Sequence, residues 1–314
     1  MIMKKGFLTA IIFFLLGYLI RYPKEALIAA REGMGLWLNT LIPALLPFII
    51  LTDAMIKKGS IEKILHPFQK VWKLLLGVSS CGAYAWLLGI LCGYPMGAKI
   101  TSDLYGAHKI SLREAEYLLT FASCASPAFI STYLVKICLE DQFSVRYVYG
   151  VLFLSSVLTM LFFRFLVYRN HTFSGKKVTE SKKEASISSP QGALLDTSIM
   201  NGFETITRLG GYILLFSIVI SCLRHYWKPD GPAGYLMLGS VELTTGLGQI
   251  AASVLTSGQK SFCALTLTSF GGFCVMAQTR SLLHKEVPFR YYIEGKLINA
   301  FFTAGLILVF SKII

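Results

Sequence analysis

The sequence predicts an all-α polytopic membrane protein, with about eight or nine apolar segments in two repeat-like halves that contain discontinuous or re-entrant helices. Composition carries this prediction, because 54% of the 314 residues are hydrophobic and 15% are charged, against roughly 25% charged in an average soluble domain. Mean hydropathy is +0.60. The apolar runs are too continuous for barrel strands, and a helix satisfies its backbone groups within lipid.

The net charge is +13, a balance that can indicate nucleic-acid binding. Here the cations lie mostly between apolar runs, where they meet anionic lipid headgroups. We therefore expect the lipid bilayer as a partner and no nucleic acid. Seven cysteines stand in apolar stretches without CxxC spacing, which indicates neither disulfides nor zinc. Enzyme motifs are also absent from the sequence, so we expect no enzyme, no metal and no cofactor.

The first half, residues 1–168, begins with a helix. Lys4 and Lys5 precede a charge-free run over 6–20, and the absence of a small-residue cleavage site after it predicts an uncleaved segment. A hydrocarbon core needs about 20 residues of helix. Further candidate segments of this half lie at 33–52, 74–98, 117–135 and 147–163.

Shorter helices are expected between these segments. Residues 21–32 and 57–73 mix cations with apolar side chains, which is typical of helices lying in the membrane interface. Ser111 and Glu114 have the spacing of a capping box, so a helix is predicted to start at Ser111.

Residues 169–197 are polar and rich in Ser and Lys, which predicts a solvated loop. The loop divides the N-terminal membrane half from a C-terminal half, residues 198–314. Apolar segments of the second half lie at 209–223, 243–259, 261–279 and 297–311.

The spacing of their interruptions predicts that the two halves are related. GYPMGAK begins at Gly93 and SCASPAF begins at Ser123, 30 residues later. GSVELTTG begins at Gly239 and SFGGFCV begins at Ser269, again 30 residues later. Interrupted apolar segments at matching positions of two halves indicate a transporter binding site. We therefore expect the substrate to bind at these interruptions.

The first interruption combines backbone freedom with charge. Pro95 removes a backbone donor, Gly93 and Gly97 allow non-helical geometry, and Lys99 adds a positive charge. Freed N–H groups at the start of a half-helix can hold an anion. The alternative is packing, in which Gly89, Gly93 and Gly97 let helices approach and Lys99 reaches the interface.

The second interruption contains Ser123, Ser126 and Pro127. Pro127 prevents one helical hydrogen bond, and the serines can satisfy freed backbone groups or a ligand. An ordinary proline kink explains the same residues equally well.

Glu242 places a carboxylate within an apolar segment, which is costly and indicates function. We expect it to bind a coupling cation or proton, or to pair with Arg208 or Lys99; a structural ion pair is the alternative. Arg208 also stands four residues after Glu204, the spacing of a surface pair. The candidate substrate-binding residues of the second half are Arg208, Glu242, Thr244, Thr245, Ser269, Gly271, Gly272 and Gln278.

The motifs GYPMGAK, SCASPAFI, E-x-T-x-G from Glu242 to Gly246 and FGGFCVMAQ from Phe270 to Gln278 resemble those of the nucleoside-recognition (Gate) domain membrane proteins. More narrowly, the chain resembles the YlbJ (SpoVV) group of sporulation integral membrane proteins over nearly its whole length. This resemblance implies discontinuous-helix transport architecture and a role in spore formation. For the group, it implies movement of dipicolinic acid across the outer forespore membrane.

An anionic substrate agrees with the residues. Dipicolinate is a small planar dicarboxylate, so half-helix N-termini with Lys99 or Arg208 suit its carboxylates, and Tyr94 can stack on its ring. The alternatives are a membrane scaffold of a sporulation complex and a nucleoside-type carrier. Helix packing at small residues also permits a homo-oligomer.

Overall fold

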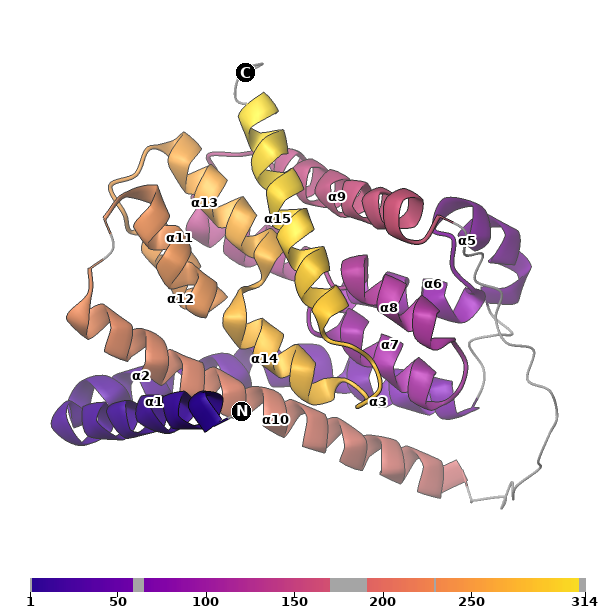
Figure 1. The fold of residues 1–314 in the computed structure, drawn as a ribbon, viewed down its shortest axis with the longest axis horizontal. Coiled ribbons are helices and arrows are strands. Elements are labelled where there is room, and N and C mark those ends of the chain that lie inside the picture. Colours follow the sequence, from indigo (N-terminus) through magenta and orange to yellow (C-terminus); the bar gives the residue numbers. More distant parts are fainter. Residues whose placement is uncertain (1, 59–64, 170–190, 229, 311–314) are drawn as a thin grey trace.

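The computed structural model describes residues 2–58, 65–169, 191–228 and 230–310, and all regular elements of these residues are helical (Figure 1). Before the polar loop they are α1 (Ile2–Arg21), α2 (Pro23–Leu36), η1 (Trp37–Leu41), α3 (Ile42–Lys58), η2 (His66–Phe68), α5 (Gln69–Leu75), α6 (Ser80–Cys92), α7 (Met96–Gly106), α8 (Leu112–Phe121), η3 (Phe129–Cys138), α9 (Val145–Phe162) and η4 (Phe163–Val167). After it they are α10 (Gln191–Tyr226), α11 (Gly231–Val241), α12 (Leu243–Ala251), α13 (Ser257–Phe270), α14 (Gly272–Leu282) and α15 (Arg290–Phe310).

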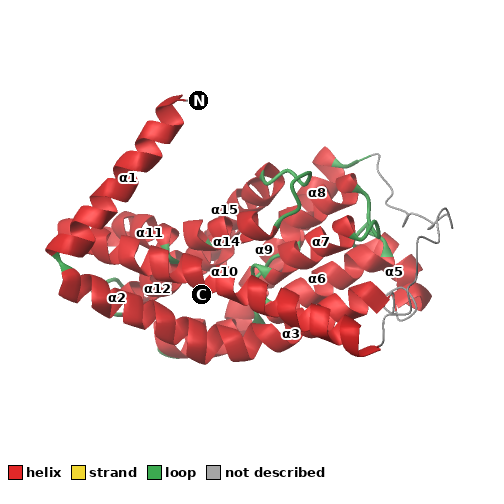
Figure 2. Cartoon of the chain, turned by 90° about the horizontal axis from the view of Figure 1, so that it is seen from below, coloured by secondary structure: helices red, strands yellow, loops and turns green. Residues whose placement is uncertain are grey.

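One side of the molecule is a layer of α2, α3 and α10, with the long α10 packed along the other two (Figure 1). Trp37 of η1 fixes the register, because its Nε1 donates to the Ile206 carbonyl oxygen at 2.8 Å. Gly210 provides the space, since a Cβ there would lie 2.5 Å from the Trp37 ring. In Figure 2, α1 projects from one end of this layer.

Polar side chains cap several helix starts. The predicted start at Ser111 is confirmed, because its hydroxyl accepts from the Glu114 backbone N–H at 3.2 Å. A capping box also predicts that the Glu114 side chain accepts from the Ser111 backbone N–H, and this part of the prediction is wrong. The Glu114 carboxylate is buried and instead accepts from the backbone N–H of Ser79 at 2.7 Å, which ties the start of α6 to α8.

Four helices are long and apolar enough to cross a membrane, and up to six spans result if each of two bent pairs counts as one. The four are Val145–Val167, Leu194–Tyr226, Ser257–Leu282 and Arg290–Phe310. They contain the predicted segments 147–163, 209–223 and 261–279, and residues 297–310 of the predicted segment 297–311. The bent pairs overlap 33–52 and 74–98. Eight or nine full spans are therefore not confirmed.

Several predicted segments are not continuous helices, and segments 74–98 and 261–279 contain the ends of α6 and α13. Segment 117–135 is broken between α8 and η3, and segment 243–259 contains the end of α12 at Ala251 and the start of α13 at Ser257. Pro127 marks the break in segment 117–135, whereas apolar composition extends through the turn before Ser257 and does not reveal it.

The predicted polar stretches agree in part with the structure. Residues 23–32 of the predicted interfacial helix lie in α2, whereas 59–64 of the second one lie outside the described residues. Residues 170–190 of the predicted loop also lie outside them. Its C-terminal limit at 197 is wrong, because α10 already begins at Gln191.

Candidate functional site

Each of the four predicted interruptions is a break between two helices. α6 ends at Cys92 and is followed by Gly93, which has a φ of +85°, and α7 begins after Pro95. The next break separates α8 from η3. In the second half, Glu242 adopts extended geometry between α11 and α12, and Gly271, at a φ of +85°, separates α13 from α14.

The broken helices of the two halves contact each other. α7 of the first half packs against α14 of the second, and η3 of the first packs against α12 of the second. Each half also ends in a long helix, α9 or α15, in the same order of elements. The relation between the halves stays a prediction, and this reciprocal packing is the arrangement it would require.

Glycines at the first break are used for close packing. A Cβ on either Gly89 or Gly97 would collide with the Ala122 carbonyl oxygen, and one on Gly93 would lie 2.9 Å from the Ser126 backbone nitrogen. The packing alternative therefore explains Gly97. At the fourth break, Gly272 lies against the chain near Ser240, whose carbonyl oxygen would be 3.2 Å from an added Cβ.

A buried lysine of α15 lies where the breaks meet. Lys296 is 4% exposed, and its Nζ donates to the carbonyl oxygen of Ser123 at 2.6 Å. The ammonium lies over two aromatic rings, 5.0 Å from the ring centroid of Tyr94 and 5.7 Å from that of Tyr292. Its surroundings thus combine a carbonyl beyond the end of α8 with two ring faces, and both favour a cation.

A cavity of about 60 Å³ lies beside Lys296. Asn299 lies one helical turn further along α15, and its Oδ1 accepts from the Ser155 hydroxyl at 2.8 Å. Ser269 shares a hydrogen bond of 2.6 Å with Thr303. The polar groups of the cavity lining are Cys124, Tyr149, Ser156, Thr268, Ser269, Lys296 and Asn299.

Three residues that contact Lys296 have a hydroxyl without a hydrogen-bond partner. The hydroxyls of Ser123, Tyr94 and Tyr292 are buried and neither accept nor donate a hydrogen bond within the described chain. Buried polar atoms without partners are uncommon in folded proteins. Their position next to the breaks makes this region the centre of the candidate site.

Glu242 is 7% exposed and caps the half-helix α12. Its carboxylate accepts from the backbone N–H groups of Thr244 at 3.0 Å and Thr245 at 2.7 Å, and from the Thr244 hydroxyl. The predicted pairing with Arg208 or Lys99 is wrong. The break leaves the first N–H groups of α12 without helical partners, and the nearest acceptor is the carboxylate of the preceding residue.

Lys99 and Arg208 instead face a second cavity of about 440 Å³, between α3, α7, α10 and α14. Each has its own carboxylate four residues away. The Lys99 Nζ lies 2.6 Å from Asp103, and the Arg208 guanidinium lies 2.5 Å from Glu204. The same cavity contains a third such pair, Asp53 with Lys57. We name this cavity the charged cleft.

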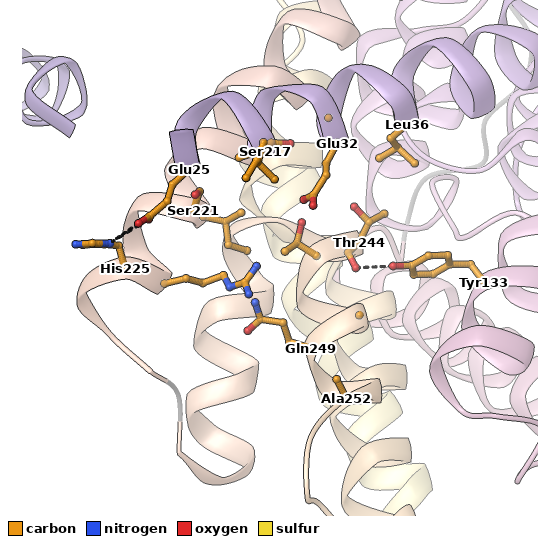
Figure 3. Close-up of a pocket in the computed structure, with 17 residues that line it drawn as sticks. Glu25, Glu32, Leu36, Tyr133, Ser217, Ser221, His225, Thr244, Gln249 and Ala252 are labelled. Atoms are coloured by element: carbon orange, nitrogen blue, oxygen red, sulfur yellow. Dashed lines mark hydrogen bonds and ion pairs between the residues drawn. The ribbon is translucent and has the colours of Figure 1, made fainter. Parts of the chain in front are cut away.

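Thr244 and Thr245 face a third cavity of about 740 Å³, between α2, α10 and α12 (Figure 3). We name it the large cleft. Glu25 and Glu32 enter it from α2, and the Glu25 carboxylate lies 3.0 Å from His225 Nδ1. The hydroxyl of Tyr133 from η3 donates to the Thr244 carbonyl oxygen at 2.7 Å at its inner wall (Figure 3).

The remaining predicted residues lie at the breaks. The Ser126 hydroxyl accepts from the Phe129 backbone N–H at 3.3 Å, so it satisfies a backbone group, as the kink alternative expects. Gln278 is buried and donates to the sulfur of Cys274 at 3.5 Å. The residues around Lys296 or its cavity are Tyr94, Ser123, Pro127, Ser269 and Gly271.

Sequence reasoning missed Lys296 and Asn299. The apolar run begins at 297, so Lys296 looked like its outer border, whereas the helix starts at Arg290. A signal was present: Lys296, Asn299 and Thr303 have the i, i+3, i+7 spacing of one helix face, and all three are buried.

Apolar spans around a buried polar region of broken helices define an integral membrane protein. The chain is 24% identical, over 332 residues, to the sporulation integral membrane protein YlbJ of Bacillus subtilis (strain 168), and the match covers 95% of this chain and 81% of that protein. This similarity supports the YlbJ group to which the motifs point. No family model matches the chain, and no solved structure does.

Proposed function

We propose that this protein is an integral membrane transporter needed for sporulation, and that it moves a small carboxylate, dipicolinic acid, across the outer forespore membrane. The observation that carries the proposal is the meeting of helix breaks from both halves at one buried polar region. Helices that only anchor a protein gain nothing from such breaks, because irregular backbone at membrane depth must be satisfied by protein or a water-filled cavity.

The cavities support a route through the protein. The large cleft reaches the break before α12, the small cavity lies beside Lys296, and the charged cleft lies along α7 and α14. A carrier needs access to a central site from two directions. Each of these three cavities is lined by at least one of the broken helices, so together they supply the elements of such access.

The charged groups support an anionic substrate. The charged cleft presents Lys57, Lys99 and Arg208, and a carboxylate can exchange with the side-chain carboxylates that hold them. The similarity to a sporulation membrane protein supports the setting, and the resemblance to the YlbJ group supports dipicolinic acid as the substrate.

Uptake of labelled dipicolinate into liposomes containing only the purified protein tests the proposal. We expect uptake above that of protein-free liposomes, and a strong reduction in Lys99→Ala and Glu242→Ala. Lys260→Ala is the matched control, because the Lys260 ammonium donates to the Ala251 carbonyl oxygen at 2.6 Å and lines none of the three cavities. Folded protein without uptake under any ion gradient would contradict transport and favour a scaffold.

A further inference from the structure

We infer that Lys296 is an anion-binding residue that receives a single carboxylate group in the small cavity between α9, α13 and α15. The inference rests on the proposed function for the choice of ligand. It places the binding site in the small cavity, at a residue other than Lys57, Lys99 and Arg208 of the charged cleft. It concerns the binding of the anion and not its transport.

Charge is the first argument. Lys57, Lys99 and Arg208 each have a carboxylate within 2.7 Å. Lys296 is more deeply buried than any of these side chains, and no carboxylate of the described residues lies within 4.0 Å of its Nζ. An unpaired buried charge is costly. A bound anion would neutralise the positive charge of Lys296, which no side chain of the described residues neutralises.

Hydrogen bonding is the second argument. An ammonium group has three donors, and the protein uses one of them, on the Ser123 carbonyl oxygen. The rings of Tyr94 and Tyr292 favour the cation without accepting a conventional hydrogen bond. Donors therefore remain for a ligand. Ser123 and Tyr94, the residues that supply this carbonyl and one of these rings, also have buried hydroxyls without a partner in the described chain.

The cavity is large enough for a carboxylate group. Its volume is about 60 Å³, and one water molecule needs roughly 10–15 Å³ of such space. The hydroxyl of Ser269 and the side chain of Asn299 line it, and both can contact carboxylate oxygens. A dicarboxylate would thus place one of its two carboxylates at Lys296.

The competing explanation is that Lys296 only holds the backbone together. Its contact with Ser123 at the end of α8 and its proximity to Gly271 at the end of α13 would then be its whole role, because helix C-termini attract cations. The two explanations differ in what happens when the charge is removed or internally neutralised.

Binding of dipicolinate, succinate and acetate to the purified full-length protein, measured by calorimetry and by ligand-induced thermal stabilisation, is the test. Lys296→Met removes the charge at similar length. Asn299→Asp keeps the shape and adds a carboxylate one turn away, on the same helix face. We expect each variant to weaken binding of the ligand that the native protein binds by about tenfold or more. Lys260→Met is the control, with affinity within about twofold of native.

Each result decides the inference. Native-like affinity in either folded variant would overturn it, and so would a native protein that binds none of the three carboxylates. If Lys296→Met does not fold, Asn299→Asp, which retains the lysine, gives the answer. Binding lost in the variants, together with no transport by the native protein, would leave the anion site standing and reject the proposed function. Transport by the native protein, together with native-like binding in the variants, would support the proposed function and reject the anion site at Lys296.

Discussion

Gly97 and Glu242 belong to motifs that predict a binding site, but both have structural roles at the helix breaks. Gly97 lets α7 touch the Ala122 carbonyl, and Glu242 caps α12. Lys296 differs from them because its charge is not matched by any nearby carboxylate among the described residues. At the scale of the residue, a structural role is therefore indicated where the surrounding chain satisfies the charge and hydrogen bonds of a side chain. A ligand-binding role is indicated where the chain leaves them unsatisfied.

Gly97→Ala should destabilise the protein, because the new methyl group meets a backbone oxygen that cannot move aside. Overpacking of this kind costs about 1–3 kcal/mol. Thermal unfolding in detergent measures the effect. Gly211→Ala in α10 is the control, since an added Cβ there meets nothing within 4 Å and alanine favours the helix. Equal melting temperatures for the two variants would show that α7 and α8 can separate freely.

At the scale of the element, the breaks are held by the ends of the helices that flank them. α12 has nine residues, which is too short for a stable isolated helix, and its first turn depends on Glu242. α5 has seven residues, and its last carbonyls are held by a side chain from another element. Arg164 of η4 donates to the carbonyl oxygens of Leu74 at 2.9 Å and Leu75 at 2.7 Å.

Glu242→Ala should loosen the start of α12, since loss of a capping side chain costs about 0.5–2 kcal/mol. Hydrogen exchange over residues 243–251 should become faster, while exchange in α13 stays unchanged. Ser240→Ala is a suitable comparison, because the Ser240 hydroxyl donates to the Met237 carbonyl oxygen and caps no helix start. Unchanged exchange in α12 would mean that its packing against α11, α13 and η3 holds it without the cap.

Arg164→Met should free the last turn of α5. The guanidinium satisfies carbonyls that have no helical partner and complements the helix dipole, so amide exchange over residues 69–75 should rise several-fold. Arg146→Met, an exposed arginine in the first turn of α9, should leave α5 unaffected. The same exchange rates in both variants would contradict this role of Arg164.

The sequence predicts three of the breaks because Pro95, Pro127 and Gly271 act locally, through missing donors and positive φ. It predicts the break at Glu242 because a carboxylate stands there within an apolar run. It does not predict the turn between α12 and α13, where the residues are as apolar as a helix. It also does not predict that Lys296 enters the core, because a lysine beside an apolar run commonly reaches the interface. Partners such as Asp103 for Lys99 are local, but the neighbours of Lys296 come from three distant segments.

At the scale of the whole molecule, α10 connects the two larger cavities. The charged cleft uses its first half, with Glu204 and Arg208, and the large cleft uses its second half, with Arg224 and His225. Glu204 and Arg224 are 20 residues apart on one helix, about 30 Å at 1.5 Å per residue. This distance matches the thickness of a hydrocarbon core, about 30 Å. The two clefts should therefore face opposite sides of the membrane.

Single substitutions Glu204→Cys and Arg224→Cys test this arrangement in sealed proteoliposomes. A membrane-impermeant maleimide added outside should label one of them in a given orientation, and the other only after the vesicles are opened. The native protein sets the background, since its seven cysteines are buried apart from the partly exposed Cys124. Labelling of both positions from one side would contradict opposite-facing clefts.

The length of α10 has a further consequence. The candidate span Leu194–Tyr226 has 33 residues, about 50 Å of helix, whereas the hydrocarbon thickness is about 30 Å. It contains Glu204, Arg208 and Arg224, and charged side chains are costly in hydrocarbon. The turns of α10 before Glu204 should therefore extend beyond the hydrocarbon core into the headgroup region. The rim of the charged cleft would then lie among lipid headgroups, whose charge should affect which ions reach it.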